Sequence, residues 1–212
     1  MQIRDIIVGG LAAGAVVVSL YFGFGGRAPK IDLGPYDALG AVTAEETAKL
    51  LGGQGQVLVM ARDTGADKNP SVEAELKAFQ ETLKTHAGLG TAIERVRVTP
   101  MLMMATGGGV PPAELFKALE THTNAGAVVL FFGFPQLTDP EVETLRKSGL
   151  KTVVVSSLRP GYKQLFERQA IHLAIVPRPE ALPPDTPPPR TLRERFDQEF
   201  IILTPADAAR LP

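Results

Sequence analysis

The sequence predicts an α/β protein with a Rossmann-like, three-layer αβα architecture and a five-stranded parallel sheet, preceded by a transmembrane helix. Residues 126–135 contain seven Ala, Val, Leu or Phe residues without polar alternation, so this strand needs cover on both faces. Strand and helix patterns alternate regularly over residues 55–178, as in parallel sheets with right-handed crossovers. A run of 19 uncharged residues, 6–24, predicts the transmembrane helix.

The composition is that of an ordinary globular protein. The formal net charge is −1, and 44% of the residues are hydrophobic. No cluster of Lys and Arg with interleaved aromatic residues appears, so we expect no nucleic-acid partner. Cysteine is absent, which excludes disulfides and thiolate metal sites.

The N-terminal run is interpreted as an uncleaved anchor. As a helix, residues 6–24 would be about 28 Å long, close to the roughly 30 Å of a bilayer's hydrocarbon core. A cleaved signal peptide is the alternative, but its apolar core is usually shorter, and Pro29 would follow the cut after Ala28. Gly10 and Gly14 are small residues one helical turn apart, a spacing that favours close approach of two anchors in a homodimer. Flanking charges are too evenly divided to set the orientation.

The chain divides into four predicted regions: the anchor (1–26), a linker with a lead-in helix (27–54), the α/β domain (55–180), and a Pro-rich crossing with a C-terminal tail packed on the domain (181–212). The linker covers residues 27–36. A capping box, Thr43 with Glu46, then predicts a helix that ends at Gly52.

Within the domain, each element follows from its apolar pattern and its flanking signals. Residues 93–98 alternate Val with Arg, which predicts an edge strand. Residues 101–109 are expected to form a loop. The order 2-1-3-4-5 places the most apolar strand centrally. The predicted strands are 56–61, 93–98, 126–135, 151–155 and 171–176, and the predicted helices are 71–86, 111–124, 138–149 and 162–170.

The tail is expected to cross the surface in extended form, because seven prolines lie between residues 177 and 189. A second capping box, Thr191 with Glu194, predicts a short helix. Residues 200–203 could add a sixth strand, and residues 205–211 a last short helix.

Ligands of open parallel sheets bind outside the carboxyl ends of the strands, where the strand order reverses. Polar side chains and glycines in the loops at this edge are therefore the candidate ligand-binding residues. The glycines of 107–109 either present amides to an anion or form a flexible turn, and the serines of 156–157 either bind a ligand or cap the following helix. The candidates are Asp63, Thr64, Thr106, Gly107, Gly108, Ser156, Ser157 and Arg159.

No catalytic, metal or cofactor site is expected. The glycine loop has neither the Lys of a phosphate loop nor the spacing of a dinucleotide site. His86, His122 and His172 lack the spacing of metal ligands. Ser156 and Ser157 lack the G-x-S-x-G pattern of a nucleophile.

Residues 57–83 and 126–157, in this order of elements, resemble one lobe of a type I periplasmic sugar-binding protein. The resemblance covers about residues 55–178 and implies a small-molecule cleft and a periplasmic or extracellular location. That family closes two lobes around its ligand, and this chain is too short for a second. We therefore weigh two functions: a membrane-anchored, non-catalytic module that binds or senses a small polar molecule, and a scaffold or interaction protein without a ligand. An enzyme is the less favoured third.

Overall fold

The computed structural model describes residues 31–211, except 66–67, 157–160 and 184. The predicted anchor and the contact through Gly10 and Gly14 lie outside these residues. Within the described part, no helix combines the length and apolar character needed to cross a bilayer. Residues 33–212 form one compact unit.

Helices and strands alternate along the described chain. In order they are α2 (Gly34–Leu50), β1 (Gln54–Asp63), α3 (Pro70–Lys84), β2 (Gly88–Arg97), α4 (Pro100–Ala105), α5 (Pro112–Thr121), β3 (Ala125–Leu130), α6 (Asp139–Lys147), β4 (Lys151–Val155), α7 (Tyr162–Glu167), β5 (Leu173–Pro177), α8 (Leu192–Glu199), β6 (Phe200–Leu203) and the 3₁₀ helix η1 (Pro205–Arg210).

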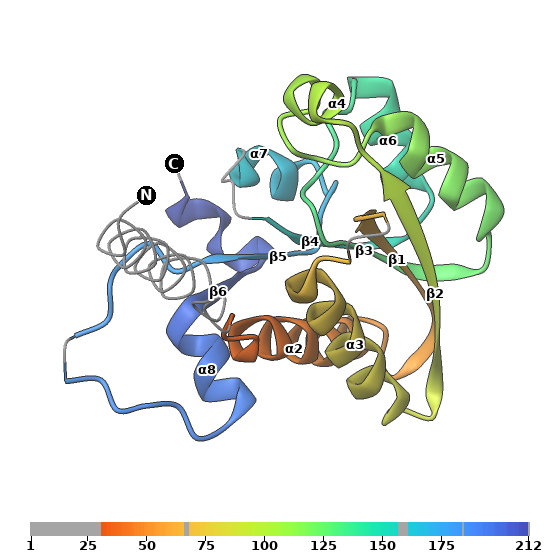
Figure 1. Ribbon diagram of the computed structural model, residues 1–212. Coiled ribbons are helices and arrows are strands. Elements are labelled where there is room, and N and C mark those ends of the chain that lie inside the picture. Colours follow the sequence, from red (N-terminus) through yellow and green to blue (C-terminus); the bar gives the residue numbers. More distant parts are fainter. Residues whose placement is uncertain (1–30, 66–67, 157–160, 184, 212) are drawn as a thin grey trace, which may run out of the picture. The chain divides into compact units, whose positions relative to one another are not determined.

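The sheet has six strands in the order β2-β1-β3-β4-β5-β6 (Figure 1). The five parallel strands have the expected order, with β2 at an edge. The sheet is larger than the predicted five strands, because residues 200–203 form the sixth strand that their apolar pattern allowed. This strand, β6, pairs antiparallel with β5 from Ala174–Leu203 to Pro177–Phe200. Without β6, the outer edge of β5 would present unpaired backbone groups. The α-helix α8 brings the chain back so that the apolar segment 200–203 covers this edge.

Helices cover both faces of the sheet. The helices α2, α3 and α8 lie on one face, and α5, α6, α7 and η1 lie on the other (Figure 1). In β3, Val129 packs on the face that α2, α3 and α8 cover. Val128 and Leu130 pack on the opposite face, and all three side chains are fully buried. The prediction of an apolar central strand covered on both sides is confirmed. The strand β3 ends at Leu130, before the predicted end, and the amide of Phe131 still donates to the carbonyl of Met60 at 3.0 Å.

Helix α2 begins nine residues before the predicted start. Its first turn contains Pro35, whose fixed φ suits this position. The predicted capping box at Thr43 is wrong: this hydroxyl lies in mid-helix and donates to the carbonyl of Leu39 at 2.6 Å. A Thr inside a helix can satisfy its hydroxyl on the preceding turn, so the same residue type fits both positions. The stretch before the helix is correspondingly shorter than the predicted linker.

The predicted loop at 101–109 contains a short helix, α4. The side chain of Thr99 caps it by accepting a hydrogen bond from the amide of Leu102 at 3.3 Å. After Ala105, positive φ angles at Gly107 and Gly108 turn the chain away. The loop prediction failed because six apolar residues without a helical stripe show no periodicity.

Candidate functional site

The carboxyl ends of β1 and β3 lie side by side at the point where the strand order reverses. From β1 the chain passes to β2 on one side, and from β3 it passes to β4 on the other. In open α/β sheets this divergence creates the crevice in which ligands bind. The segments that border it are residues 62–65, 106–109, 131–136 and the start of the loop after Val155.

Asp63 and Thr64 both organise the loop that contains them. The carboxylate of Asp63 accepts a hydrogen bond from the amide of Gly65 at 2.9 Å. The hydroxyl oxygen of Thr64 accepts from the amide of Asn69 at 3.2 Å, just before α3. Each side chain therefore keeps only part of its capacity for a ligand: one carboxylate oxygen in Asp63, and the hydroxyl proton in Thr64.

An ion pair beside Asp63 fixes α3 to the edge strand. Arg95 of β2 donates two hydrogen bonds to Glu73 of α3, at 2.7 and 3.0 Å. The hydrogen bond from Arg95 lowers the pKa of Glu73, so this carboxylate stays charged. The pairing leaves neither side chain available to bind a ligand without breaking the contact.

The segment 106–109 ends α4 with internal hydrogen bonds. The amides of Gly107, Gly108 and Gly109 donate to the carbonyls of Met104, Met103 and Thr106. The hydroxyl of Thr106 donates to the carbonyl of Leu102 at 2.9 Å. These bonds favour the turn interpretation over an anion cradle, because the donors that an anion would need are already used.

The structure brings the glycine loop, the end of β3 and the end of β4 together. A side chain built on Gly133 (φ 93°) would lie 3.3 Å from the Oγ of Ser156 and 3.5 Å from the Cα of Gly109. One on Gly109 would overlap the carbonyl oxygen of Phe134. These close approaches need glycine. Ser157 and Arg159 lie outside the described residues.

Arg62 is a residue of this edge that the sequence-based selection omitted. It continues the alternation of Leu58 and Met60, so its side chain is directed to the face that α5 and α6 cover, and its register partner is Val96. Its Nε atom is buried and has no hydrogen-bond partner among the described residues. Buried donors are rarely left unpaired, because each costs about 1–3 kcal/mol. The available signal was a charged residue on the inward face of a buried strand.

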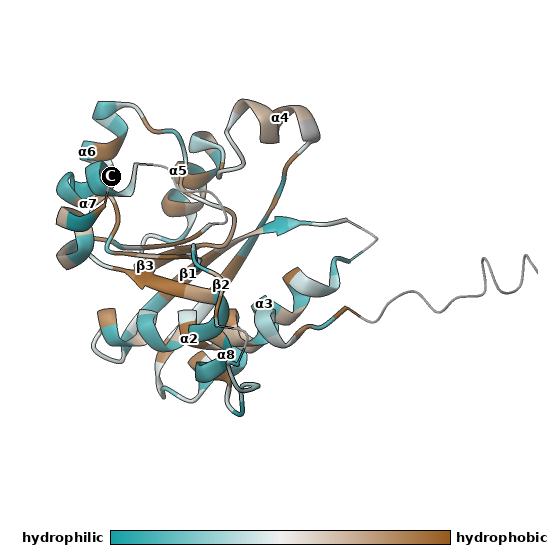
Figure 2. Ribbon diagram, turned by 90° about the vertical axis from the view of Figure 1, so that its left-hand side faces the viewer, coloured by the Kyte–Doolittle hydropathy of each residue, from teal (hydrophilic) through white to brown (hydrophobic). Residues whose placement is uncertain are grey.

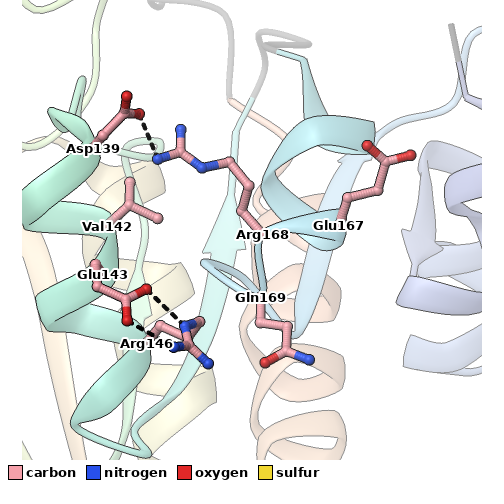
Figure 3. Close-up of a pocket in the computed structure, with 7 residues that line it drawn as sticks. All are labelled: Asp139, Val142, Glu143, Arg146, Glu167, Arg168 and Gln169. Atoms are coloured by element: carbon pink, nitrogen blue, oxygen red, sulfur yellow. Dashed lines mark hydrogen bonds and ion pairs between the residues drawn. The ribbon is translucent and has the colours of Figure 1, made fainter.

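Two surface grooves in the described part lie away from this edge. One, of about 400 Å³, runs between α6 and the end of α7. Figure 3 shows Arg168 reaching across to Asp139 (2.6 Å), while Arg146 pairs with Glu143 on its own helix (2.7 Å). The hydrogen bond from Arg146 lowers the pKa of Glu143 to about 2. The second groove, of about 430 Å³, lies between α8 and prolines 187 and 188. In the first groove, the ion pairs explain these charged side chains without a ligand.

Comparisons with known proteins reveal a likeness of fold. No protein-family profile and no curated protein matches the sequence. The arabinose-binding protein AraP of Geobacillus stearothermophilus has 15% identity and a TM-score of 0.55, covering 84% of this chain and 63% of its own. A sugar-binding protein of a sugar ABC transporter from Bacillus halodurans has 14% identity and a TM-score of 0.54, covering 84% and 64%.

A third structure, an Agrobacterium vitis solute-binding protein bound to α-D-tagatopyranose, has 13% identity and a TM-score of 0.52, covering 81% of this chain and 58% of its own. The chain thus spans less than two thirds of the length of these structures. At such identities the likeness concerns the fold alone, and it agrees with the resemblance expected from the sequence. The described chain therefore has the fold of the sugar-binding solute-binding proteins of ABC transporters, over about the extent of one lobe.

Proposed function

We propose that the protein is a membrane-anchored, extracytoplasmic module that binds a small polar molecule at the carboxyl edge of its sheet, without catalysis. The observation that carries the proposal is Arg62 near the end of β1, a strand that borders the strand-order reversal; its buried Nε has no hydrogen-bond partner among the described residues. The fold likeness supports the choice of edge. The uncharged run at 6–24 supports the anchor, and the likeness to solute-binding proteins of ABC transporters supports an extracytoplasmic location.

The proposed ligand carries hydroxyl or anionic groups. A guanidinium donates to oxygen atoms, the second oxygen of Asp63 accepts from a hydroxyl, and the Thr64 hydroxyl donates. D-arabinose and α-D-tagatopyranose, found in two of the similar structures, are ligands of this chemistry. The remaining proposed binding residues follow the sequence-based selection: Thr106, Gly107, Gly108, Ser156, Ser157 and Arg159.

The second candidate function is a scaffold or interaction protein without a ligand. One similar solved structure is the XylFII–LytSN complex, with a TM-score of 0.53, 14% identity, and coverage of 81% of this chain and 60% of that one. Proteins of this fold thus also occur in protein complexes. The internal hydrogen bonds of the glycine loop favour the same candidate, because they leave fewer donors for a ligand.

A ligand screen separates the two candidates. The full chain in detergent micelles is unfolded thermally with a panel of pentoses, hexoses and small carboxylic acids. Binding predicts a midpoint that rises with concentration for at least one compound. No shift with any of them, from a cooperatively folded sample, would favour the scaffold.

The variant Arg62→Gln tests the site directly. Loss of a charged hydrogen bond predicts a dissociation constant roughly ten- to a hundredfold higher, measured by titration calorimetry with the compound found in the screen. Arg146→Gln, in the groove between α6 and α7, is the matched control and should bind normally. The double variant Asp63→Ala/Ser156→Ala should also weaken binding; wild-type affinity in both variants would place the site elsewhere.

A further inference from the structure

The short helix α4 carries an uncovered apolar surface. Met101 is 77% exposed and Met104 is 80% exposed, the two highest values among the large hydrophobic residues described. Residues 100–105 contain no charged or polar side chain. Figure 2 shows α4 standing clear of the helices that cover the sheet. Two neighbouring methionines exposed to this extent indicate a contact surface, which we name the α4 surface.

The chain enters the compact unit at the same edge. A turn of three residues, 51–53, joins helix α2 to the first residue of β1, so the C-terminus of α2 lies at the amino edge of the sheet. It packs alongside α3, with Gly40 against Glu75 and Phe79, and both helices run in the same direction. Gly34, the first residue of α2, therefore lies at the carboxyl edge, where α4 follows β2.

The connection to the uncharged run is short. Nine residues separate Phe24, the last residue of that run, from Gly34. Fully extended, the ten steps from Phe24 to Gly34 span at most about 36 Å. If the run spans a bilayer, the edge at which the chain enters the unit remains within this distance of the lipid headgroups.

We propose that the carboxyl edge faces the bilayer and that the α4 surface inserts Met101 and Met104 at the boundary of headgroups and acyl chains. This inference rests on the membrane anchor of the proposed function. The tether supplies a high effective concentration, so a contact of two methionines suffices, although it would be too weak for a free protein. Lys68 and Arg97 are exposed near the same edge and suit lipid phosphates.

Lipid is favoured over a protein partner by the chemistry of the α4 surface. It has no charged or hydrogen-bonding side chain that could specify a partner's position, whereas a bilayer needs none. The candidate ligand site then opens beside the membrane, and a ligand reaches it laterally along the membrane surface.

The absence of cysteine allows a direct test with single labels. The full chain is reconstituted into vesicles as Met104→Cys, labelled with bimane. The control is Ala87→Cys, an exposed position at the opposite edge, just before β2. Phospholipids with a doxyl group near the headgroup quench a bimane that lies among them. We expect at least threefold stronger quenching at position 104 than at position 87.

Alkaline carbonate extraction of the same vesicles tests the membrane anchor separately from the contact between the α4 surface and the bilayer. Protein that resists extraction but shows equal, weak quenching at both positions keeps the anchor and overturns the bilayer contact. Release of the protein by carbonate would overturn both the anchor and the bilayer contact. Strong quenching at position 104 that falls to the level of position 87 in a Met101→Gln variant supports the inference. The label at position 104 could instead be shielded in native membranes but not in pure lipid vesicles. That result would assign the α4 surface to a protein partner and overturn the bilayer contact.

Discussion

Glu75 of α3 carries a buried carboxyl group, with 7% of the residue's surface exposed. Burial raises its pKa to about 8, because a charged carboxylate loses its hydration there. The folded-state pKa therefore exceeds the unfolded value of 4.5. Its contribution to stability is complete below pH 4.5 and is lost as the pH rises towards 8.

The variant Glu75→Gln should remove this pH dependence. Between pH 4.5 and 8, we expect the free energy of unfolding of the wild type to fall by at most about 5 kcal/mol more than that of the variant. Urea unfolding at several pH values measures the difference. Glu81→Gln, an exposed position on the same helix, should follow the wild type; a parallel pH profile for Glu75→Gln would contradict the assignment.

The pKa of His172 is lowered instead of raised, so its effect on stability has the opposite dependence on pH. Its Nδ1 accepts a hydrogen bond from the backbone amide of Thr152 at 3.2 Å, which extends the pairing of β4 and β5 by one residue. Burial, followed by the charge of Lys151, lowers the pKa of His172. Stability from this contact is present above pH 6.5 and is lost as the pH falls through the lowered pKa.

Accordingly, His172→Asn should shrink the loss of stability on acidification below pH 6.5. Urea unfolding of both proteins between pH 4 and 7 provides the measurement. His122→Asn serves as the control, because this partly buried imidazole lies away from β4 and β5 and pairs with Glu94 of β2 at 2.7 Å. If His172→Asn loses as much stability below pH 6.5 as the wild type, the buried imidazole is not the titrating group.

At the scale of elements, the packing of α2 on α3 depends on one glycine. A Cβ at Gly40 would overlap the carbonyl oxygen of Glu75, and backbone atoms cannot move aside as a side-chain tip can. Gly40→Ala would gain up to about 1 kcal/mol of helix propensity. We expect a net loss of at least about 1 kcal/mol in unfolding free energy, because overpacking typically costs 1–3 kcal/mol or more.

Gly161→Ala provides the comparison for thermal and urea unfolding. The nearest atom to a Cβ at Gly161 is 3.9 Å away, so the added methyl group meets no obstacle. It should change stability little. Equal stability of Gly40→Ala and wild type would show that the two helices can separate without cost.

At the scale of the whole molecule, the C-terminal segment belongs to the core. Phe196 of α8 is 1% exposed and packs with the helices on the α2–α3 face, and β6 extends the sheet. Phe196→Ala should lower the unfolding free energy by about 3–5 kcal/mol while unfolding remains a single transition. Leu192→Ala, half exposed on the same helix, should cost far less. Two separate transitions in the urea profile would instead make α8 and β6 an independent appendage.

The candidate site was only partly accessible from the sequence. The positions of Asp63 and Ser156 at the candidate edge could be predicted because a strand end is visible as the boundary of an apolar run. The hydrogen bonds that occupy Thr106 and the glycine amides were hidden, since they depend on α4, which shows no periodicity. Arg62 was overlooked because its burial depends on β2 and β3, which are distant in the sequence.

The sequence by itself determined the parallel order β2-β1-β3-β4-β5 and the covered central strand β3, because binary patterning and crossover handedness are local consequences of the chain. Only the tertiary structure decided where α2 begins and that β6 closes the sheet edge. A Thr can satisfy its hydroxyl inside a helix or at its start, and four apolar residues can form a strand only if an unpaired edge is within reach. Both outcomes depend on neighbours that folding brings together, and those neighbours leave no local mark in the sequence.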